Sequence, residues 1–341
     1  MEVFCTSPWV PPEWIKAHGL EPHGIWLARN FACEPLPLAG GVCAFANAAV
    51  RLAEQQTAAA FVFTSHCDQL RRGFDAIAQP GSARVFLFNL PATWQTPAAQ
   101  RIFSDELRRL GRFLVRMGGH APTPGGLFEI MKEYDHERSK LLEAAAWCRA
   151  RPYAEAVAHV HLEGSVNLPP EAAARHAWVT PREEDRGGGR SPLRATSAIP
   201  LALVGGPLPQ SQMPLLDAIE KAGGQVVLNA TEAGERSLWA VSPPDHSREN
   251  AFDLLVHRWL ANCVDVFQRP NTRLYDWLRP RLTERQARGI VLWHYVGCDL
   301  WRAEAQPLRQ AFGLPVVLLD ADEAALQRNV GRLEAFLESL R

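Results

Sequence analysis

One short pattern restricts the fold of this chain more than any other feature. In the first half, the apolar segment AAAFVFTSH (58–66) is followed at once by Cys67-Asp68 and a helical stretch. A second apolar segment, ARVFLFNLP (83–91), comes next. Apolar runs without alternation are typical of strands covered on both faces, as in parallel sheets. The segment therefore predicts a strand–helix–strand unit of α/β type.

The same pattern occurs a second time near the end of the chain. The apolar segment GIVLWHYVG (289–297) is followed by Cys298-Asp299 and a helix, and then by LPVVLLDAD (314–322). Two similar α/β domains, each with a Cys-Asp pair at the carboxyl end of a parallel strand, are the simplest interpretation.

The positions of Cys67 and Cys298 in this pattern favour chemistry. In open α/β sheets, ligands bind outside the carboxyl ends of the strands. Each Cys also lies near the start of the next helix, where the helix dipole favours a thiolate. We therefore expect both Cys to face a cleft between the domains. The alternative is that both are buried thiols in strand–helix turns.

The domain organisation follows from the same pattern. We predict Rossmann-like or flavodoxin-like domains, with parallel sheets flanked by helices, at 1–150 and 198–341. A helical connection and a polar, Gly-rich linker occupy 151–197. Within the first domain, residues 1–45 read as irregular apart from one short helix near Glu13–His18. In the second, Asn250–Phe267 reads as one long helix.

Composition narrows the class of protein. The chain has 341 residues, 47% of them hydrophobic, and a net charge of −1. No basic field favours nucleic acid or an anionic membrane surface. The start lacks the features of a signal peptide, and no apolar run reaches the roughly 18 residues of a membrane helix. We therefore expect a cytoplasmic protein with reduced thiols.

The familiar local motifs do not occur in the sequence. It contains no Walker A sequence, no G-x-G-x-x-G after a strand, no G-x-S-x-G and no H-E-x-x-H. His159 and His161 form an H-x-H, but a helix separates positions i and i+2, so we expect solvated side chains. The seven Cys are scattered, without any C-x-x-C pair. A metal cluster would therefore be assembled from distant Cys by the fold.

Six segments, in the right order, give the chain a family likeness. It resembles the cluster-bearing subunits of the 2-hydroxyacyl-CoA dehydratase and benzoyl-CoA reductase family over nearly its whole length. The segments are CTSPWVPPEWIKAHGLEP, TSHCDQLRRGFD, FNLPATWQT, FSDELRRLGRFL, WHYVGCDLWRAEAQPLRQAFGLPVVLLDAD and GRLEAFLESL.

The resemblance implies a cofactor and its ligands. In the family, three Cys of one subunit bind a [4Fe–4S] cluster. By position these are Cys43, Cys67 and Cys298, with the cluster in the cleft between the domains. The family often has C-P-Y-S at the first of these positions, whereas this chain has Cys-Ala-Phe-Ala.

The other Cys receive different roles from the resemblance. Cys5 and Cys263 lie in segments where family members also often carry Cys, so they are reserve ligands. They would enter if the chain held a double cubane. Cys33 and Cys148 are expected to be structural.

The resemblance also implies an activity. It indicates a subunit of an ATP-activated, radical-type enzyme of anaerobic metabolism, which passes one low-potential electron to an acyl-CoA substrate. That enzyme is either a 2-hydroxyacyl-CoA dehydratase, a lyase, or a benzoyl-CoA reductase-like oxidoreductase. The implied partners are a related second subunit, in a hetero- or homodimer, and a separate ATP-dependent iron–sulfur activator protein.

Two other readings stay open at this point. The chain is either an iron–sulfur electron-transfer or accessory subunit without its own acyl-CoA site, including the double-cubane reductase type, or a cluster-free protein with buried thiols. A substrate-sized cleft beside the cluster would separate the enzyme from the accessory subunit. Iron content would separate both from the third reading.

Two His flank the Cys-Asp pairs. His66 and His294 are candidate catalytic proton donors, or hydrogen-bond donors to a cluster sulfur. The alternative is a packing role in each strand–helix turn. We expect Asp68 and Asp299 to cap the following helices.

Four further side chains lie beside the Cys-Asp pairs. Arg71 and Arg72 are candidates for contacts with CoA phosphates, although a solvated helix face explains them as well. Trp293 and Trp301 either shield a cluster from water or belong to the core.

Overall fold

The computed structural model describes residues 1–28, 31–33, 42–78, 83–144, 150–163, 198–239, 250–321 and 326–341. Two features of the sequence analysis fall outside these residues, namely Cys148 and the polar, Gly-rich linker that ends at residue 197. His159 and His161 belong to a helix, but their side chains are also outside the described set.

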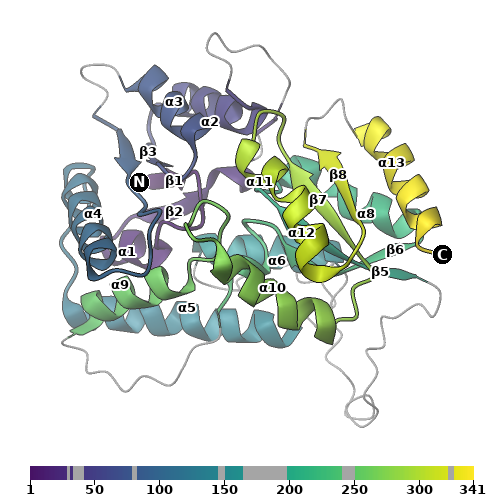
Figure 1. Ribbon diagram of the computed structural model, residues 1–341. Helices are drawn as coiled ribbons and strands as arrows, with labels where there is room; N and C mark the ends of the chain where they lie inside the picture. Colours follow the sequence, from purple (N-terminus) through teal and green to yellow (C-terminus); the bar gives the residue numbers. More distant parts are fainter. Residues whose placement is uncertain are drawn as a thin grey trace.

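Two parallel sheets form the centre of the molecule, one from each half of the chain (Figure 1). Their strand orders are β2-β1-β3-β4 and β6-β5-β7-β8, and every neighbouring pair is parallel. This confirms the prediction of two similar α/β units. The strands are β1 (Glu2–Cys5), β2 (Glu21–Gly24), β3 (Ala60–Thr64), β4 (Val85–Phe88), β5 (Ile199–Gly205), β6 (Gly224–Ala230), β7 (Gly289–His294) and β8 (Val316–Asp320).

The strands that precede Cys67 and Cys298, β3 and β7, are the most enclosed strands of their sheets. Every residue of β3 and of β7 is buried. Each of these strands has a parallel neighbour on both edges. A strand paired on both edges and covered on both faces can use apolar side chains at every position, which explains the runs without alternation.

Helices cover the faces of both sheets (Figure 1). Among them, α3 packs on β3 and β4, α8 packs on β6, and α13 packs on β8. The helices are α1 (Pro12–Ala17), α2 (Ala44–Gln55), α3 (Asp68–Ile77), α4 (Pro97–Arg116), α5 (Pro124–Ala144), α6 (Ala150–Glu163), α8 (Pro214–Lys221), α9 (Ala251–Asn262), α10 (Thr272–Glu284), α11 (Asp299–Ala303), α12 (Ala305–Phe312) and α13 (Leu326–Ser339).

The prediction of an irregular segment at 1–45 was wrong, because this segment supplies β1 and β2. Each of these strands has only four residues, and β2 reads EPHG, so neither shows an apolar run. Pairing with β3 holds β1 in the sheet. The short helix expected near Glu13–His18 is present as α1.

The long helix expected at Asn250–Phe267 was also wrong at its end, because α9 stops at Asn262. The carboxylate of Asp265 accepts a hydrogen bond from the backbone N–H of Phe267 at 3.3 Å, and such side chain–backbone bonds compete with a helix. The sequence analysis also missed α10, which follows this turn.

The two halves of the chain share one apolar core. The cluster that contains Phe61 of the first sheet continues to Leu201 and Leu319 of the second. Helix α6 packs on both β2 and β6, and α9 from the second half packs on α4 and α5 of the first. The domain boundaries therefore stay predictions. Within the described residues, no helix is both long and apolar enough to cross a bilayer.

Candidate functional site

Both sheets bring their Cys-bearing turns to a topological switch point. In each sheet the two central strands are neighbours, and the chain continues from one of them to one edge strand and from the other to the opposite edge strand. Ligands of open α/β folds bind in the crevice that this reversal creates. Cys67 follows β3, and Cys298 follows the equivalent strand, β7.

The two turns meet at one small pocket with a volume of about 50 Å³. Cys43, which precedes α2, lines it together with Cys67 and Cys298. The structure therefore brings the three Cys expected as ligands to a single place, from both halves of the chain. The other lining residues are Phe45, His66, Leu70, Gly206, Pro207, Glu232, Asp265, Val266, Tyr295, Leu300 and Trp301.

All three Cys occupy the same local position, the N-cap of a helix. Cys43 is the N-cap residue of α2, Cys67 that of α3 and Cys298 that of α11. Backbone N–H groups of the first helical turn interact with each sulfur and lower its pKa. A helix N-terminus offers partial positive charge and unpaired donors, and both favour a thiolate.

Burial has the larger effect on these thiols. It raises the pKa of Cys67 and of Cys298 to about 12, and it raises the pKa of Cys43 as well. Charge on Cys43 would raise the pKa of both other thiols further. Near pH 7 the three groups are therefore protonated thiols, unless positive charge lies between them.

Gln69 links the three Cys-bearing segments. This side chain lies in the first turn of α3, directly after Cys67 and Asp68. Its Oε1 accepts a hydrogen bond from the N–H of Cys43 at 2.9 Å, and its Nε2 donates to the carbonyl of Gly297 at 3.4 Å.

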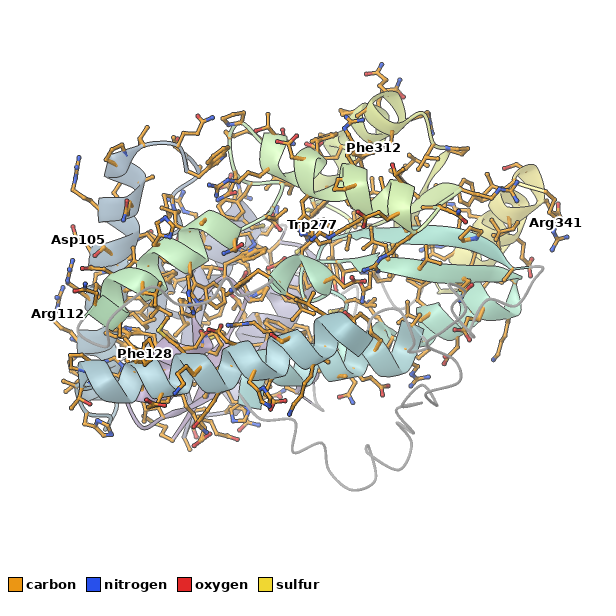
Figure 2. The ribbon with its side chains drawn as sticks, turned by 90° about the horizontal axis from the view of Figure 1, so that it is seen from below. Asp105, Arg112, Phe128, Trp277, Phe312 and Arg341 are labelled. Atoms are coloured by element: carbon orange, nitrogen blue, oxygen red, sulfur yellow. The ribbon has the colours of Figure 1, made fainter. Side chains whose placement is uncertain are left out.

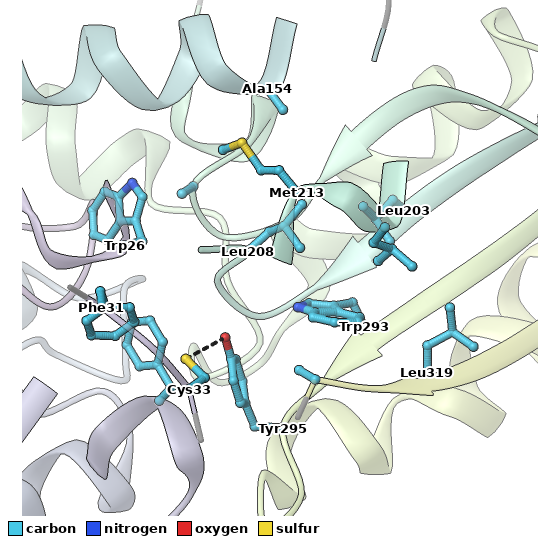
Figure 3. Packing of buried hydrophobic residues seen from close by; sticks show 14 of the residues in the cluster. Trp26, Phe31, Cys33, Ala154, Leu203, Leu208, Met213, Trp293, Tyr295 and Leu319 are labelled. Carbon is cyan, nitrogen blue, oxygen red and sulfur yellow. Dashed lines mark hydrogen bonds between the residues drawn. The ribbon is translucent and has the colours of Figure 1, made fainter. Parts of the chain in front are cut away.

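The remaining described Cys do not line this pocket. Cys5 and Cys263 are buried in a separate apolar cluster around Trp259, so their role as reserve ligands stays a prediction. Cys33 is fully buried, and its Sγ lies 3.7 Å from the hydroxyl of Tyr295 (Figure 3). Its packing in the shared core fits the structural role expected for it.

The two candidate His separate in the structure. His66 lines the pocket, and its Nδ1 lies 2.9 Å from Oγ1 of Thr64. His294 does not line the pocket. Its Nδ1 lies 3.1 Å from the carbonyl of Tyr295, and its Nε2 lies 3.3 Å from a carboxylate oxygen of Asp320.

Glu232 is a pocket residue that the sequence analysis missed. Its Oε1 accepts a hydrogen bond from Ser7 Oγ at 2.6 Å and lies 3.7 Å from Nε2 of His66. Burial, together with the charge of Asp265, raises the pKa of Glu232 to about 8. Burial lowers the pKa of His66 to about 4. Both groups are therefore predominantly neutral near pH 7.

The sequence analysis also missed a buried ion pair beside the pocket, of which Asp265 is a lining residue. Arg236 donates to a carboxylate oxygen of Asp265 at 2.6 Å, and both side chains are almost fully buried. The same guanidinium donates to the carbonyls of Ala230, Val264 and Gly205. Because these bonds use several of the five Arg donors, this pair is anchored to the backbone on all sides.

One signal could have identified Glu232 in advance. It comes two residues after the end of β6, and Ser7 comes two residues after the end of β1. The rule that singled out Cys67 and Cys298 applies to every parallel strand of the two sheets. Asp265 carries no such signal, because the sequence analysis placed it inside a helix.

The other residues singled out from the sequence fall into two groups. Asp68 and Asp299 lie in the first helical turn rather than at the N-cap, which the Cys occupy. Arg71 is exposed and lies 3.9 Å from Asp68, which fits a solvated helix face.

Trp301 lines the pocket and is 3% exposed, with the guanidinium of Arg236 stacked 4.7 Å from its ring. Trp293 instead belongs to the apolar core, where its Nε1 donates to the carbonyl of Pro207 at 3.2 Å. Figure 3 shows Trp293 among core residues from both halves of the chain, such as Phe31 and Leu319.

The arrangement does not match a site for a single metal ion. Among the described residues, no group of three His, Cys, Asp or Glu side chains is close enough to share one ion. The thiols of a multinuclear cluster bind different metal atoms, so they lie farther apart than the ligands of one ion.

Comparison with known proteins identifies the family of this chain. No individual curated protein matches the sequence. The family model described as 2-hydroxyglutaryl-CoA dehydratase, D-component, matches residues 9–340, which is nearly the whole chain and includes every strand except β1 and all three pocket Cys. The chain therefore belongs to the 2-hydroxyglutaryl-CoA dehydratase D-component family.

Proposed function

We propose that this chain is the iron–sulfur subunit of a 2-hydroxyacyl-CoA dehydratase-type enzyme, with a [4Fe–4S] cluster held by Cys43, Cys67 and Cys298. One observation carries the proposal. Three thiols from distant parts of the sequence, each at a helix N-cap, line the same pocket at the switch points of two parallel sheets.

The chemistry of the three thiols supports iron as their occupant. Buried thiols with raised pKa values are inert alone, whereas metal binding releases their protons and uses the thiolates as ligands. Cys thiolates are the usual ligands of iron–sulfur clusters. Three thiolates leave one iron without a protein ligand, and catalytic metal sites keep such an open position.

When bound, the cluster would supply a low-potential electron for a CoA thioester. The protein's own residues would control protons and water around it. Glu232 holds a proton near pH 7, hydrogen-bonded to Ser7 and beside the neutral ring of His66. His66 and Glu232 are therefore our candidates for proton transfer at Nε2 and Oε1. Trp301 and Tyr295 exclude water from the same pocket.

The proposal includes further components. The family name describes one component of a dehydratase, so we expect a related partner subunit and an acyl-CoA substrate. The sequence has no Walker A motif. A separate ATP-dependent iron–sulfur protein would therefore deliver the electron.

One observation favours a second candidate function, an accessory or electron-transfer subunit. The pocket beside the thiols encloses about 50 Å³, whereas pockets for small-molecule ligands typically reach about 300–1,000 Å³. With a cluster bound there, the described residues would leave no space beside the three Cys for an acyl-CoA group. The acyl site would then belong to the partner subunit.

The first test is the iron and sulfide content of protein purified without oxygen, together with its visible spectrum. We expect about four irons per chain and a broad absorption band, since these clusters are held by thiolates. About eight irons would instead indicate a double cubane and bring in Cys5 and Cys263. An iron-free protein after anaerobic reconstitution would refute the cluster.

Ligand assignment needs matched variants. We expect Cys67→Ser and Cys298→Ser each to lose most of the iron, whereas Cys5→Ala and Cys263→Ala keep it. Circular dichroism before iron loading separates loss of a ligand from loss of the fold. Full iron content in folded Cys67→Ser or Cys298→Ser protein would contradict the assignment. A dehydration assay on 2-hydroxyacyl-CoA thioesters, with and without partner subunit, then separates the two candidate functions.

A further inference from the structure

A second, much larger pocket lies among helices that pack around the first sheet. It encloses about 710 Å³, within the typical range for sites that bind small organic molecules. Helices α1, α4, α5 and α9 surround it. It shares no lining residue with the pocket of the three Cys.

The two pockets lie at opposite ends of the strands of the first sheet. Cys67 follows the carboxyl end of β3, whereas the large pocket includes His18, just before β2 begins, and Arg116, at the end of α4. Since helices of α/β units run antiparallel to the strands, the end of α4 lies at the amino ends of the strands. The large pocket is therefore a separate site.

The floor of this pocket is apolar and firmly held. Trp14 is 8% exposed, and its Nε1 donates to the carbonyl of Leu107 at 2.9 Å. The His18 ring packs edge-on against Trp14 at 4.6 Å, and its Nδ1 donates to the Trp14 carbonyl at 2.7 Å. Phe252 of α9 tilts against the same Trp at 5.1 Å. These contacts keep the floor formed before any ligand arrives.

The charge around the pocket has one sign. Arg108, Arg112 and Arg116 line it at four-residue spacing, which places them along one face of α4. No Asp or Glu is among its described lining residues. Arg108 stacks 4.7 Å from the ring centroid of Phe252 and also contacts Asp105, whereas Arg112 has no hydrogen bond or ion pair among the described residues.

The pocket also receives the start of a helix. Thr123 and Pro124 line it at the beginning of α5, where Thr123 Oγ1 accepts the N–H of Gly126 at 3.1 Å. Figure 2 shows Arg112 at the same end of the molecule as Phe128, in the second turn of α5. The N-terminus of a long helix adds positive potential to that of the arginines.

We propose that this pocket binds an organic anion with an apolar body and a phosphate or carboxylate head group. The apolar body would lie on Trp14 and Phe252, and the head group would bind Arg112 and its neighbours on α4. Guanidinium groups suit both kinds of head group, because their paired donors match two oxygens at once.

Calorimetric titration of the full chain with decyl phosphate and with decanoate tests this proposal. Decanol and inorganic phosphate are the controls, since the first lacks the charge and the second lacks the apolar body. We expect both amphipathic anions to bind at least tenfold more tightly than either control. Tighter binding of decyl phosphate would assign a phosphate head group, and tighter binding of decanoate a carboxylate.

Variants locate the binding. We expect Arg112→Gln to weaken it about tenfold, as expected when one charge-assisted contact is lost. Val115→Trp, which extends a large ring from an exposed lining position, should abolish it. Arg101→Gln, on the same helix but outside the pocket, is the matched control and should change affinity less than twofold.

Three results would overturn the proposal. They are equal affinity for decanol and decanoate, equal loss in Arg101→Gln and Arg112→Gln, and no binding of either anion at millimolar concentration. Melting curves of each variant confirm that the chain is folded before titration.

Discussion

The Cys67 turn and the Cys298 turn share a topology but differ in what they contribute to the pocket. Two residues separate the end of β3 from Cys67, whereas three separate the end of β7 from Cys298. The longer turn includes Gly297, at φ 87°, and the exposed Val296. This difference changes which side chain faces inward: His66 in the first turn and Tyr295 in the second.

The polar support of the two turns differs as well. The Cys67 turn is supported by neutral hydroxyl groups. The hydroxyl oxygens of Thr6 and Thr64 lie 3.1 Å apart, and the hydroxyl of Thr64 contacts His66. The Cys298 turn is supported by a buried ion pair. Arg236 pairs with Asp265 and also donates to the carbonyl of Gly205, which lies beside Trp293 of β7. A repeated fold therefore fixes where the Cys lie, but not the chemistry of their surroundings.

The largest expected effect comes from removing the buried positive charge that supports the Cys298 turn. Arg236→Met leaves Asp265 buried without its partner, and we expect it to lower the free energy of unfolding by about 3–5 kcal/mol. Arg332→Met is the control, because Arg332 pairs with Asp320 while about half exposed, and it should cost at most about 1 kcal/mol. Urea unfolding curves measure both. Similar decreases in the free energy of unfolding of the two variants would mean that the buried pair stabilises the protein no more than the exposed pair.

The glycine behind Cys298 gives the next largest effect. Gly205 has φ 151°, and a Cβ there would lie 1.9 Å from the carbonyl oxygen of Trp293. We expect Gly205→Ala to cost about 3 kcal/mol through overlap and backbone strain. At Gly331 in α13 a Cβ meets nothing within 4 Å, so Gly331→Ala should stabilise the protein by up to about 1 kcal/mol. Thermal unfolding distinguishes the two, and a neutral Gly205→Ala would contradict the packing described above.

A pH experiment isolates Glu232. Its pKa is raised from 4.5 to about 8 in the folded protein, so between these values the folded state holds a proton that the unfolded state releases. Stability from this group is therefore lost as pH rises through that window, by at most about 1.4 kcal/mol per pH unit. His66 has its folded pKa below its usual value of 6.5, so its own contribution to stability stops changing about one unit above pH 6.5 and is common to the two proteins compared below.

Glu232→Gln should remove this dependence. On iron-free protein, we expect its stability relative to the unmodified chain to rise steadily from pH 6.5 to pH 8. Parallel stability curves for the two proteins across this range would show that Glu232 is ionised in the fold.

The smallest expected effect concerns the neutral hydroxyl groups that support the Cys67 turn. Thr64→Val removes the hydroxyl that contacts Thr6 and His66, and we expect it to lower the free energy of unfolding by about 1 kcal/mol. Thr57→Val, at an exposed position, should have no measurable effect. A loss as large as that in Arg236→Met would show that the two turns are supported equally.

The sequence allowed the sheets to be predicted where apolar runs were long enough to be distinctive. This holds for β3 and β7, and for the placement of Cys67 and Cys298 after them. It failed for β1 and β2, whose short segments form strands through pairing rather than through their own pattern. It also failed at α9, where the buried Asp265 binds backbone groups beyond the helix end.

The sequence allowed the Cys of the pocket to be predicted, but not its carboxyl and hydroxyl groups. A Cys repeated in two equivalent turns is visible in a sequence, and the family resemblance added Cys43. Glu232, Ser7 and Asp265 meet only after both sheets have packed on a shared core, because nothing local relates them. Of the two His, only the fold decides that His66 lines the pocket and that His294 contacts Asp320.

Gln69 has a consequence for how the protein is made. Its side chain contacts Cys43 and, 228 residues further along the chain, Gly297 beside Cys298. A ribosome therefore releases two of the three pocket thiols long before it synthesises the third. During that interval Cys43 and Cys67 have no finished pocket around them. A cofactor that needs all three thiols would therefore be inserted only after translation is nearly complete.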